Sequence, residues 1–160
     1  MIARLIDVAR RRGLKSAVLS FVPHPAQFFL GAAYRPLYTE TEQAALLAET
    51  GLDFWIPYPF DRALADRSAN DFIVWLRSAL RCRYVLAGEG FRFGRGREGT
   101  LRTLQTLGAE QGLFAEGIRH CQQEGEIIST SRIRRLLAEG DTAAAEQLLG
   151  RPYPIVGESR

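Results

Sequence analysis

Three hydroxyl residues, Ser129, Thr130 and Ser131, run directly into a segment whose apolar residues have helical spacing. Ser131 is placed to cap this helix, because its side-chain oxygen can accept a hydrogen bond from the first turn. The first turn then holds three arginines: Arg132, Arg134 and Arg135. Cations at a helix N-terminus oppose the helix dipole, at a cost of about 0.3–1 kcal/mol each when exposed. A bound phosphate would remove this conflict, because N–H groups, hydroxyls and guanidinium groups all bind phosphate oxygens; the alternative is an ordinary capped helix whose arginines point into water.

A histidine stands between two prolines in the turn Pro23-His24-Pro25. The turn follows residues 16–21, a mostly apolar run that predicts a buried parallel strand. Ligands of open α/β sheets bind outside the carboxyl ends of the strands, and two prolines make this turn stiff. His24 is therefore a candidate contact for a ligand or a phosphate. The alternative is a rigid loop with a solvated imidazole.

Residues 88–100 form a loop rich in glycine and arginine between a predicted strand and a predicted helix. Its glycines let the backbone approach a ligand closely, and its arginines can meet phosphate. The loop is not a Walker loop, because no Gly-Lys-Ser/Thr sequence follows. A flexible surface loop is the alternative, but Phe91 and Phe93 argue against it, since two large rings would anchor the segment.

The composition is that of a globular protein, with 46% hydrophobic and 24% charged residues in a chain of 160, enough for one domain with a sizeable core. A net charge of +3 (21 basic minus 18 acidic residues) is too small to indicate nucleic-acid binding. No apolar run approaches ~18 residues, so no membrane span is expected. Cys82 and Cys121 are too few for a disulfide scaffold, which favours a reducing cytoplasm. His120 beside Cys121 has no partner at metal-ligand spacing, so no metal site is assigned.

Apolar periodicity and capping residues predict helices that alternate with short strands. Helices are expected over residues 1–12, 39–51, 68–80, 101–107, 131–140 and 141–150. Strands are expected over residues 16–21, 52–58, 83–87 and 113–118. Residues 26–38 are expected to be irregular, with aromatic side chains that enter the core or line a pocket for a flat ring. The pattern predicts an α/β fold, a parallel sheet with helices on both faces, whose loops could meet at one rim around a polyphosphate.

Four segments resemble motifs of the bacterial FAD synthetases, the bifunctional riboflavin kinase/FMN adenylyltransferases. Residues 21–25, Phe-Val-Pro-His-Pro, resemble their Phe-Asp-Pro-His-Pro turn. Residues 88–94, Gly-Glu-Gly-Phe-Arg-Phe-Gly, resemble their Gly-x-Asp-Phe-x-Phe-Gly loop. Residues 128–134, Ile-Ser-Thr-Ser-Arg-Ile-Arg, resemble their Ile-Ser-Ser-Thr-x-x-Arg motif, and residues 149–153, Leu-Gly-Arg-Pro-Tyr, look like the junction before their kinase domain. The order and spacing of all four match, which makes the resemblance a strong signal.

The resemblance implies a Rossmann-like nucleotidyltransferase domain that converts ATP and FMN into FAD and pyrophosphate with Mg²⁺. It implies catalytic roles for Arg134 and Ser131, and no protein ligand of a metal. The residues it assigns to ATP are Ser129, Thr130, Ser131, Arg134, Gly88, Phe91 and Gly94. The residues it assigns to FMN are Pro23, His24, Pro25 and Phe28.

This sequence also departs from the family pattern. The family begins with a strand and a Gly-x-Phe-Asp-Gly-Val-His-x-Gly-His loop, and Met1 and Ile2 stand where that loop should end. We therefore expect that the first strand is missing, either because the recorded start is too late or because the chain is complete but degenerate. Gly90 replaces the usual Asp or Asn of the second motif. Residues 1–150 are expected to form the adenylyltransferase-like domain, and residues 151–160 a tail leading to an absent riboflavin kinase domain.

Three functions stay open. The first is FMN adenylyl transfer, impaired in this chain by the missing histidine loop. The second is a catalytically degenerate module that binds flavin or nucleotide, and the third is a nucleotidyltransferase for another phosphate-bearing acceptor. All three predict small-molecule partners, a cytoplasmic location, and no nucleic-acid or membrane partner.

Overall fold

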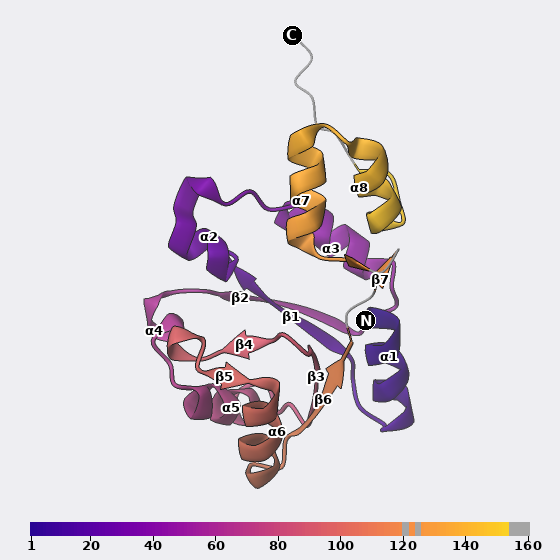
Figure 1. Ribbon diagram of the computed structural model, residues 1–160. Coiled ribbons are helices and arrows are strands. Elements are labelled where there is room, and N and C mark those ends of the chain that lie inside the picture. Colours follow the sequence, from indigo (N-terminus) through magenta and orange to yellow (C-terminus); the bar gives the residue numbers. More distant parts are fainter. Residues whose placement is uncertain (120–121, 124–125, 154–160) are drawn as a thin grey trace. The chain divides into compact units, whose positions relative to one another are not determined.

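The computed structural model describes residues 1–119, 122–123 and 126–153 (Figure 1). The chain divides into two compact units, Met1–Arg119 and His120–Arg160. The elements of the first unit are α1 (Ile2–Arg11), β1 (Ala17–Val22), α2 (Pro25–Leu30), η1 (Gly31–Ala33), α3 (Glu40–Ala48), β2 (Phe54–Pro59), α4 (Arg62–Ala65), α5 (Ala69–Ser78), β3 (Tyr84–Gly88), β4 (Arg92–Phe93), η2 (Arg95–Arg97), β5 (Gly99–Thr100), α6 (Leu101–Glu110) and β6 (Phe114–Ile118). The elements described in the second are β7 (Gln122–Gln123), β8 (Glu126–Ile127), α7 (Thr130–Glu139) and α8 (Thr142–Leu149). None of the helices within these ranges is long and apolar enough to cross a membrane.

The four longer strands form two parallel pairs. β1 pairs with β2 in a register that places Ala17 opposite Phe54, and β3 pairs with β6 with Tyr84 opposite Phe114. Helices lie in the connection between the strands of each pair, as parallel strands require. The predicted strands and their parallel pairing are therefore confirmed, with boundaries within two residues of the expected ones.

Both faces of the pair β1–β2 carry a helix. Leu19 and Phe21 face the main core, which α5 builds. Ser20, between them, points to the opposite face, where its Oγ accepts hydrogen bonds from Trp55 Nε1 at 3.1 Å and from Gln43 Nε2 of α3 at 3.4 Å. Alternating side chains of one strand thus serve two layers, which is the arrangement that an α/β fold requires.

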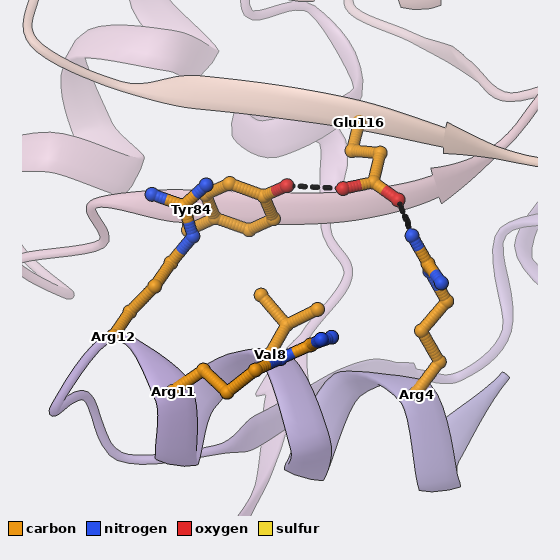
Figure 2. Close-up of a pocket in the computed structure, with 6 residues that line it drawn as sticks. All are labelled: Arg4, Val8, Arg11, Arg12, Tyr84 and Glu116. Atoms are coloured by element: carbon orange, nitrogen blue, oxygen red, sulfur yellow. Dashed lines mark hydrogen bonds and ion pairs between the residues drawn. The ribbon is translucent and has the colours of Figure 1, made fainter.

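The pair β3–β6 is covered in the same way. Val85, Ala87 and Ala115 belong to the main core beneath α5 and α6. Tyr84 and Glu116 point to the other face, where α1 lies (Figure 2). The predicted helices on both faces of parallel strands are confirmed.

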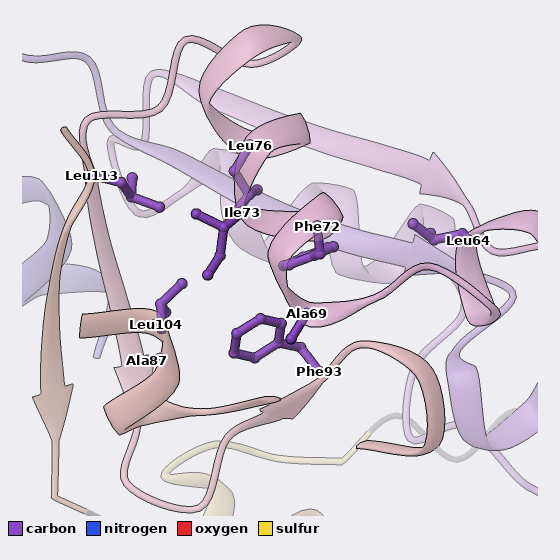
Figure 3. Close-up of a cluster of buried hydrophobic side chains, with 9 residues drawn as sticks. All are labelled: Leu64, Ala69, Phe72, Ile73, Leu76, Ala87, Phe93, Leu104 and Leu113. Carbon is purple, nitrogen blue, oxygen red and sulfur yellow. The ribbon is translucent and has the colours of Figure 1, made fainter. Parts of the chain in front are cut away.

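The core of the first unit is a cluster of buried apolar side chains from α4, α5, α6, β3, β4 and the residue before β6 (Figure 3). Ile73 of α5, Leu104 of α6 and Leu113 are fully buried. The members of the cluster are Leu64, Ala69, Phe72, Ile73, Leu76, Ala87, Phe93, Leu104 and Leu113. Figure 3 shows Ile73 and Leu104 pointing toward one another, so α5 and α6 pack directly on each other.

A polar clasp, formed by Lys15, Ser16 and Asp53, joins the residues that directly precede β1 and β2. Ser16 is buried, and both its backbone N–H and its Oγ donate to Asp53 Oδ2, at 2.9 and 2.8 Å. Ser16 Oγ also accepts from the Asp53 N–H at 3.1 Å, and Lys15 Nζ donates to Asp53 Oδ1 at 2.8 Å. The hydrogen bond from Lys15, followed by those from Ser16, holds the pKa of the Asp53 carboxyl well below its usual range.

The predicted capping residues of three helices are in place. Thr39 and Glu42 form a reciprocal capping box at α3, and the hydrogen bond from the Thr39 N–H lowers the pKa of Glu42. Ser68 caps α5 by accepting from the Asp71 N–H, and Asp141 caps α8. These helices begin where the sequence predicts, because caps act within one helical turn.

Two local expectations were wrong. The first half of residues 26–38 is not irregular: α2 begins there, because Pro25 suits the first helical position and His24 supplies a side-chain cap. The N-cap of α7 is Ser129, not Ser131, and its hydroxyl accepts from the Arg132 N–H at 3.2 Å. With three consecutive hydroxyls, the sequence offered several possible caps and the helix starts at the earliest one.

The second unit contains a short antiparallel ladder between β7 and β8 and two helices that pack on one another. Both helices end at a glycine in the left-handed region, Gly140 with φ +80° and Gly150 with φ +68°. Ile133 of α7 and Ala145 of α8 are buried. The His120–Cys121 pair and residues 154–160 of the expected tail lie outside the described residues.

Candidate functional site

His24 lies at the carboxyl end of β1, just after the cis Val22–Pro23 peptide bond. It is the N-cap of α2, and its Nδ1 accepts a hydrogen bond from the Ala26 N–H at 3.1 Å. Its ring stacks on the Tyr34 ring, with centroids 4.9 Å apart and planes 5° from parallel. Since Nδ1 is the acceptor, the neutral imidazole carries its proton on Nε2. The rigid turn predicted from the two prolines is thus also held by a hydrogen bond and a ring contact.

A series of aromatic contacts runs from α2 into the core. Phe28 packs edge-on against Phe29 and Phe60, at centroid distances of 5.2 and 5.3 Å. Phe60, just after β2, contacts Phe21 of β1 at 5.7 Å. Phe29 is 63% exposed, so the series reaches the surface beside the His24 turn. Phe28 is half-buried among these rings and Phe29 is open to solvent, and the predicted pocket for a flat ring stays a prediction.

The same series continues to the glycine- and arginine-rich loop. Phe21 lies 6.3 Å from Phe72 of α5, Phe72 lies 5.3 Å from Phe93, and Phe93 stacks on Phe91 at 5.5 Å. The loop after β3 and the turn after β1 are therefore connected through one set of packed rings. This is the tertiary link between the first two predicted motifs.

The glycine- and arginine-rich loop is anchored rather than flexible. Phe93 is buried, and Gly94 lies so close to α5 that a Cβ would stand 2.8 Å from the Ala69 backbone nitrogen. Glu98 accepts from the Ala69 N–H at 2.7 Å, and the Arg95 N–H donates to the Arg67 carbonyl at 2.7 Å. The loop therefore covers the N-terminus of α5, and its glycine at position 94 has a packing reason. The three loop arginines, at positions 92, 95 and 97, are exposed.

At the start of α7 the predicted phosphate residues fall on defined helical positions. Ser129 is the cap, and its hydroxyl accepts the Arg132 N–H while its own proton stays available as a donor. Thr130 and Arg134 are four residues apart, so they share one side of the helix. Arg132 is mostly buried and pairs with Glu126 of β8 at 2.9 Å. One of the three arginines at this helix start is thus neutralised within the unit.

A cavity of about 280 Å³ lies between α1 and the strands β3 and β6 (Figure 2). Glu116 accepts hydrogen bonds from the Tyr84 hydroxyl and the Arg4 guanidinium, and these two contacts lower the pKa of its carboxyl. Burial, followed by the bond to Glu116, raises the pKa of Tyr84. Arg12 lies over the Tyr84 ring at 4.3 Å. These cationic and acidic groups satisfy one another, so we interpret the cluster as the clamp that docks α1 on the strands.

A second cavity, of about 240 Å³, opens where β2 ends and α4 begins, between Tyr58, Asp61, Leu64 and Arg67. Its position beside Phe60 places it next to the aromatic series. Within the ranges that the structure describes, no group of three or more His, Cys, Asp or Glu side chains could hold a metal ion.

The predicted site residues therefore fall into three groups. Pro23, His24, Pro25 and Phe28 lie together at the carboxyl end of β1 and the start of α2. Gly88, Phe91 and Gly94 lie at and after the carboxyl end of β3. The remaining residues belong to the second unit, at the start of α7: Ser129, Thr130, Ser131 and Arg134.

Two residues near the first group were given no individual role from the sequence, although Tyr34 belongs to the aromatic segment of residues 26–38. Tyr34 holds the His24 ring, and Phe60 links Phe28 to the core. A signal for Phe60 was available, because it follows a strand directly, where ligand-facing loops of α/β sheets begin. Nothing in the sequence pairs Tyr34 with His24, since the contact depends on how α2 and η1 turn the chain back.

Parallel strands covered by helices on both faces, with the unusual loops at strand ends, define an α/β protein with a Rossmann-like fold. A sequence model described as FAD synthetase matches residues 1–132. The chain belongs to the FAD synthetase family.

Curated relatives agree with this assignment. The bifunctional riboflavin kinase/FMN adenylyltransferase of Escherichia coli (strain K12) is 36% identical over 155 residues, which are 96% of this chain and 50% of that protein. The protein of that name from Pseudomonas fluorescens is 32% identical over 158 residues, 98% of this chain and 51% of its own length. A putative bifunctional riboflavin kinase/FMN adenylyltransferase of Geobacillus thermodenitrificans is 31% identical over 161 residues, 95% of this chain and 81% of that protein. The chain spans about half the length of the first two.

A solved structure shares the fold. The crystal structure described as a macrolide-efflux protein from Streptococcus pneumoniae superposes with a TM-score of 0.78 at 22% sequence identity. The match covers 94% of this chain and 59% of that one. At this level of identity the similarity concerns the fold alone.

Proposed function

We propose that this chain is an FMN adenylyltransferase, which transfers AMP from ATP to FMN and releases pyrophosphate. The observation that carries the proposal is the match of residues 1–132 to the FAD synthetase family, together with relatives named for FMN adenylyl transfer. In this reaction an oxygen of the FMN phosphate attacks the α-phosphorus of ATP. The bond from the α-phosphorus to the bridging oxygen breaks, and pyrophosphate leaves with that oxygen. Neither step needs a covalent bond to the protein, so the protein's task is to orient the two phosphates and to neutralise charge.

The start of α7 would bind the ATP phosphates. Thr130, Ser131 and Arg134 supply two hydroxyls and a guanidinium around the first turns, and the helix N-terminus adds backbone N–H groups. Ser129 can donate its own hydroxyl proton while it accepts the capping bond. Charge that develops on the leaving pyrophosphate would be stabilised by Arg134. Arg132 is assigned no phosphate, because Glu126 already pairs with it.

The turn after β1 would bind FMN. Pro23, His24 and Pro25 form a held turn, and Phe28 belongs to an aromatic series that can pack against the isoalloxazine ring. The loop after β3, with Gly88, Phe91 and Gly94, would shape the adenine and ribose side. Because Gly94 packs on Ala69, its proposed role in ATP binding is indirect: the glycine allows the loop to follow this path beside α5.

Mg²⁺ would be held mainly by the triphosphate. The ranges that the structure describes contain no group of acidic residues that could bind it unaided, and Mg²⁺ commonly binds through substrate phosphates and water. A riboflavin kinase domain is expected in the full-length protein, because the relatives are bifunctional by name. Residues 1–150 would form the transferase domain, with residues 151–160 leading onward, and a cytoplasmic location fits the supply of ATP and FMN.

The direct test is FAD formation by the purified chain with ATP, FMN and Mg²⁺, followed by chromatography. We expect Arg134→Ala to lower kcat by about 10²–10³-fold, the cost of removing a donor that stabilises developing charge. Arg135→Ala, in the same helix, should stay within about threefold of the parent, since an exposed arginine that touches no substrate contributes little. FMN and ATP binding without turnover would reject the transferase in favour of a binding module. Turnover with another phosphate acceptor, but not with FMN, would reject FMN as the substrate.

A further inference from the structure

The cavity between α1 and the strands β3 and β6, here called the α1 cavity, has an unusual charge for a contact between a helix and strands (Figure 2). Four of its lining residues come from α1 and stand at positions i, i+4, i+7 and i+8, so they share one face of the helix. A helix face turned toward a core is normally apolar, whereas here three arginines surround a single valine. The lining residues are Arg4, Val8, Arg11, Arg12, Tyr84 and Glu116.

The contacts that dock α1 on the strands use only part of this cationic charge. Arg4 is the arginine that they neutralise, because its Nε donates to Glu116 Oε1 at 3.0 Å. Arg11 pairs with Asp7 at 2.6 Å, but Asp7 does not line the cavity and both side chains of this pair are more than half exposed. An exposed i,i+4 pair is weak, so Arg11 can exchange its partner at little cost.

Arg12 contacts an aromatic ring instead of a carboxylate. Its guanidinium lies over the Tyr84 ring, 4.3 Å from the centroid, and among the described residues no carboxylate pairs with it. A guanidinium over a ring still has N–H groups in its own plane, and these can bind the oxygen atoms of an anion. Three arginines and one carboxylate line the α1 cavity, and three minus one leaves two excess positive charges on its wall.

We propose that the α1 cavity binds a small polyanion of the phosphate class, with Arg11 and Arg12 as its main contacts. Guanidinium groups form paired hydrogen bonds with phosphate oxygens, and a ligand with at least two negative charges would neutralise the excess charge of the wall. The cavity volume of about 280 Å³ lies just below the range of about 300–1,000 Å³ that is usual for ligand pockets, which suits an anion as small as pyrophosphate. The diphosphate of a nucleotide has the same chemistry.

This site does not depend on FMN adenylyl transfer. All its residues belong to the first unit, whereas the residues proposed above for the ATP phosphates lie at the start of α7, in the second. An anion held between α1 and the two strands would add contacts between them. Binding should therefore also protect the amides of α1 from hydrogen exchange.

The test is a titration of the full chain with inorganic pyrophosphate, followed by ¹H–¹⁵N spectra of the backbone amides. We expect the signals of Val8, Arg12 and Tyr84 to shift in a saturable way, and sodium chloride at the same ionic strength not to reproduce the shifts. The start of α7 gives its own signals, so binding there is measured separately in the same titration. ADP is the second probe: tighter binding of ADP than of pyrophosphate at the α1 signals assigns a nucleotide to the site, and the reverse order assigns an inorganic anion.

Variants of neighbouring arginines show whether the cavity itself is responsible. We expect Arg12→Gln to raise the dissociation constant for pyrophosphate at the α1 signals about tenfold, the effect of losing one hydrogen bond to a charged group. Arg12→Lys, which restores the charge, should recover part of the affinity, and a purely structural role of Arg12 would not produce this recovery. Arg10→Gln is the matched control, because Arg10 is exposed on α1 and does not line the cavity; it should change the constant by less than about twofold.

Two results would overturn the inference. One is the absence of saturable shifts at Val8, Arg12 and Tyr84 with both pyrophosphate and ADP. The other is an equal loss of affinity in Arg10→Gln and Arg12→Gln, which would mean diffuse attraction to a cationic helix. Either result leaves the proposed function standing if FAD is formed, and saturable shifts in a chain that forms no FAD would support the site while the proposed function fails.

Discussion

At the residue scale, three arginines that are equivalent in the sequence have different environments. Arg132 has its guanidinium paired with Glu126 and most of its side chain buried, whereas Arg135 is exposed. The unfavourable interaction of cations with the helix N-terminus is thus relieved for Arg132 by a carboxylate of the same unit. The proposal above assigns Arg134, on the same side of the helix as Thr130, to the ATP phosphates.

This difference predicts that Arg132→Ala destabilises the protein by about 1–2 kcal/mol, because both the ion pair and the buried aliphatic stem are lost. The change is measured by urea unfolding followed by circular dichroism. Arg135→Ala provides the matched control and should change stability by less than about 0.5 kcal/mol. Equal losses in the two variants would mean that the pair with Glu126 contributes nothing.

At the element scale, the loop from residue 94 to residue 98 is defined by close packing on α5. Gly94 and Gly96 both have positive φ, +76° and +61°, but only Gly94 has a neighbour that a Cβ would strike. Two glycines that look alike in the sequence therefore have different requirements. Gly96 is required only for its positive φ, whereas Gly94 is required both for its positive φ and because a Cβ would strike Ala69.

We therefore predict that Gly94→Ala is more destabilising than Gly96→Ala, by about 1–3 kcal/mol, the usual cost of forcing extra atoms into a packed region. Both variants bear the strain of alanine at positive φ, so their difference isolates the contact with Ala69. Urea unfolding midpoints of the two variants give the comparison. A result in which Gly96→Ala is equally destabilised would show that backbone strain alone governs this loop.

The clasp at the start of β1 and β2 also acts at the element scale. Its hydrogen bonds hold the pKa of Asp53 below its ordinary value of 3.8. A carboxyl with a lowered pKa in the folded state stabilises the fold at pH values above 3.8, and this contribution is lost as the pH falls further. The clasp should therefore weaken in acid.

The predicted consequence is that Asp53→Asn is less stable than the parent at pH 6 and that the gap between them narrows below pH of about 4. Thermal unfolding at a series of pH values measures it. Asp66→Asn removes a carboxylate from an exposed i,i+4 pair with Arg62 and should differ little from the parent at any pH. A gap for Asp53→Asn that stays constant down to pH of about 3 would contradict the role assigned to the carboxylate.

At the scale of the whole molecule, the first unit depends on one core that both strand pairs share. Leu19 and Phe21 of β1 and Val85 of β3 pack against the same buried cluster. The aromatic series through Phe72 and Phe93 connects this core to the turn after β1 and the loop after β3, which belong to the candidate site. Site geometry in this unit is therefore coupled to core packing, although the loops themselves lie at the surface.

Ile73→Ala tests that dependence. Ile73 is fully buried, so its truncation should cost about 2–5 kcal/mol, and the loss of ring packing nearby should also weaken FMN binding. Val74, the next residue of α5, is 39% exposed, and Val74→Ala should cost less than about 1 kcal/mol. Calorimetric unfolding and flavin fluorescence measure the two effects. Unchanged FMN affinity in a folded Ile73→Ala protein would separate the site from the core.

The sequence by itself determined the four longer strands, six of the helices and their order. Thr39 with Glu42, Ser68, Asp141 and Gly140 mark helix ends through hydrogen bonds or backbone conformations that are complete within about one turn. The strands were readable for a similar reason, because each is a short apolar run between such signals. Family motifs added expected roles for three loops, which stay predictions, and the family assignment is confirmed by the match over residues 1–132.

Only the tertiary structure decided which of these residues act on one another. Tyr34 meets His24 because α2 folds the chain back, Gly94 meets Ala69 because the loop returns to α5, and Arg132 meets Glu126 because β8 precedes α7 so closely. None of these contacts leaves a periodic or compositional signal, because each depends on the path of the backbone between the partners. The sequence therefore determined the secondary structure of the main segments, and tertiary packing determined which side chains contact one another.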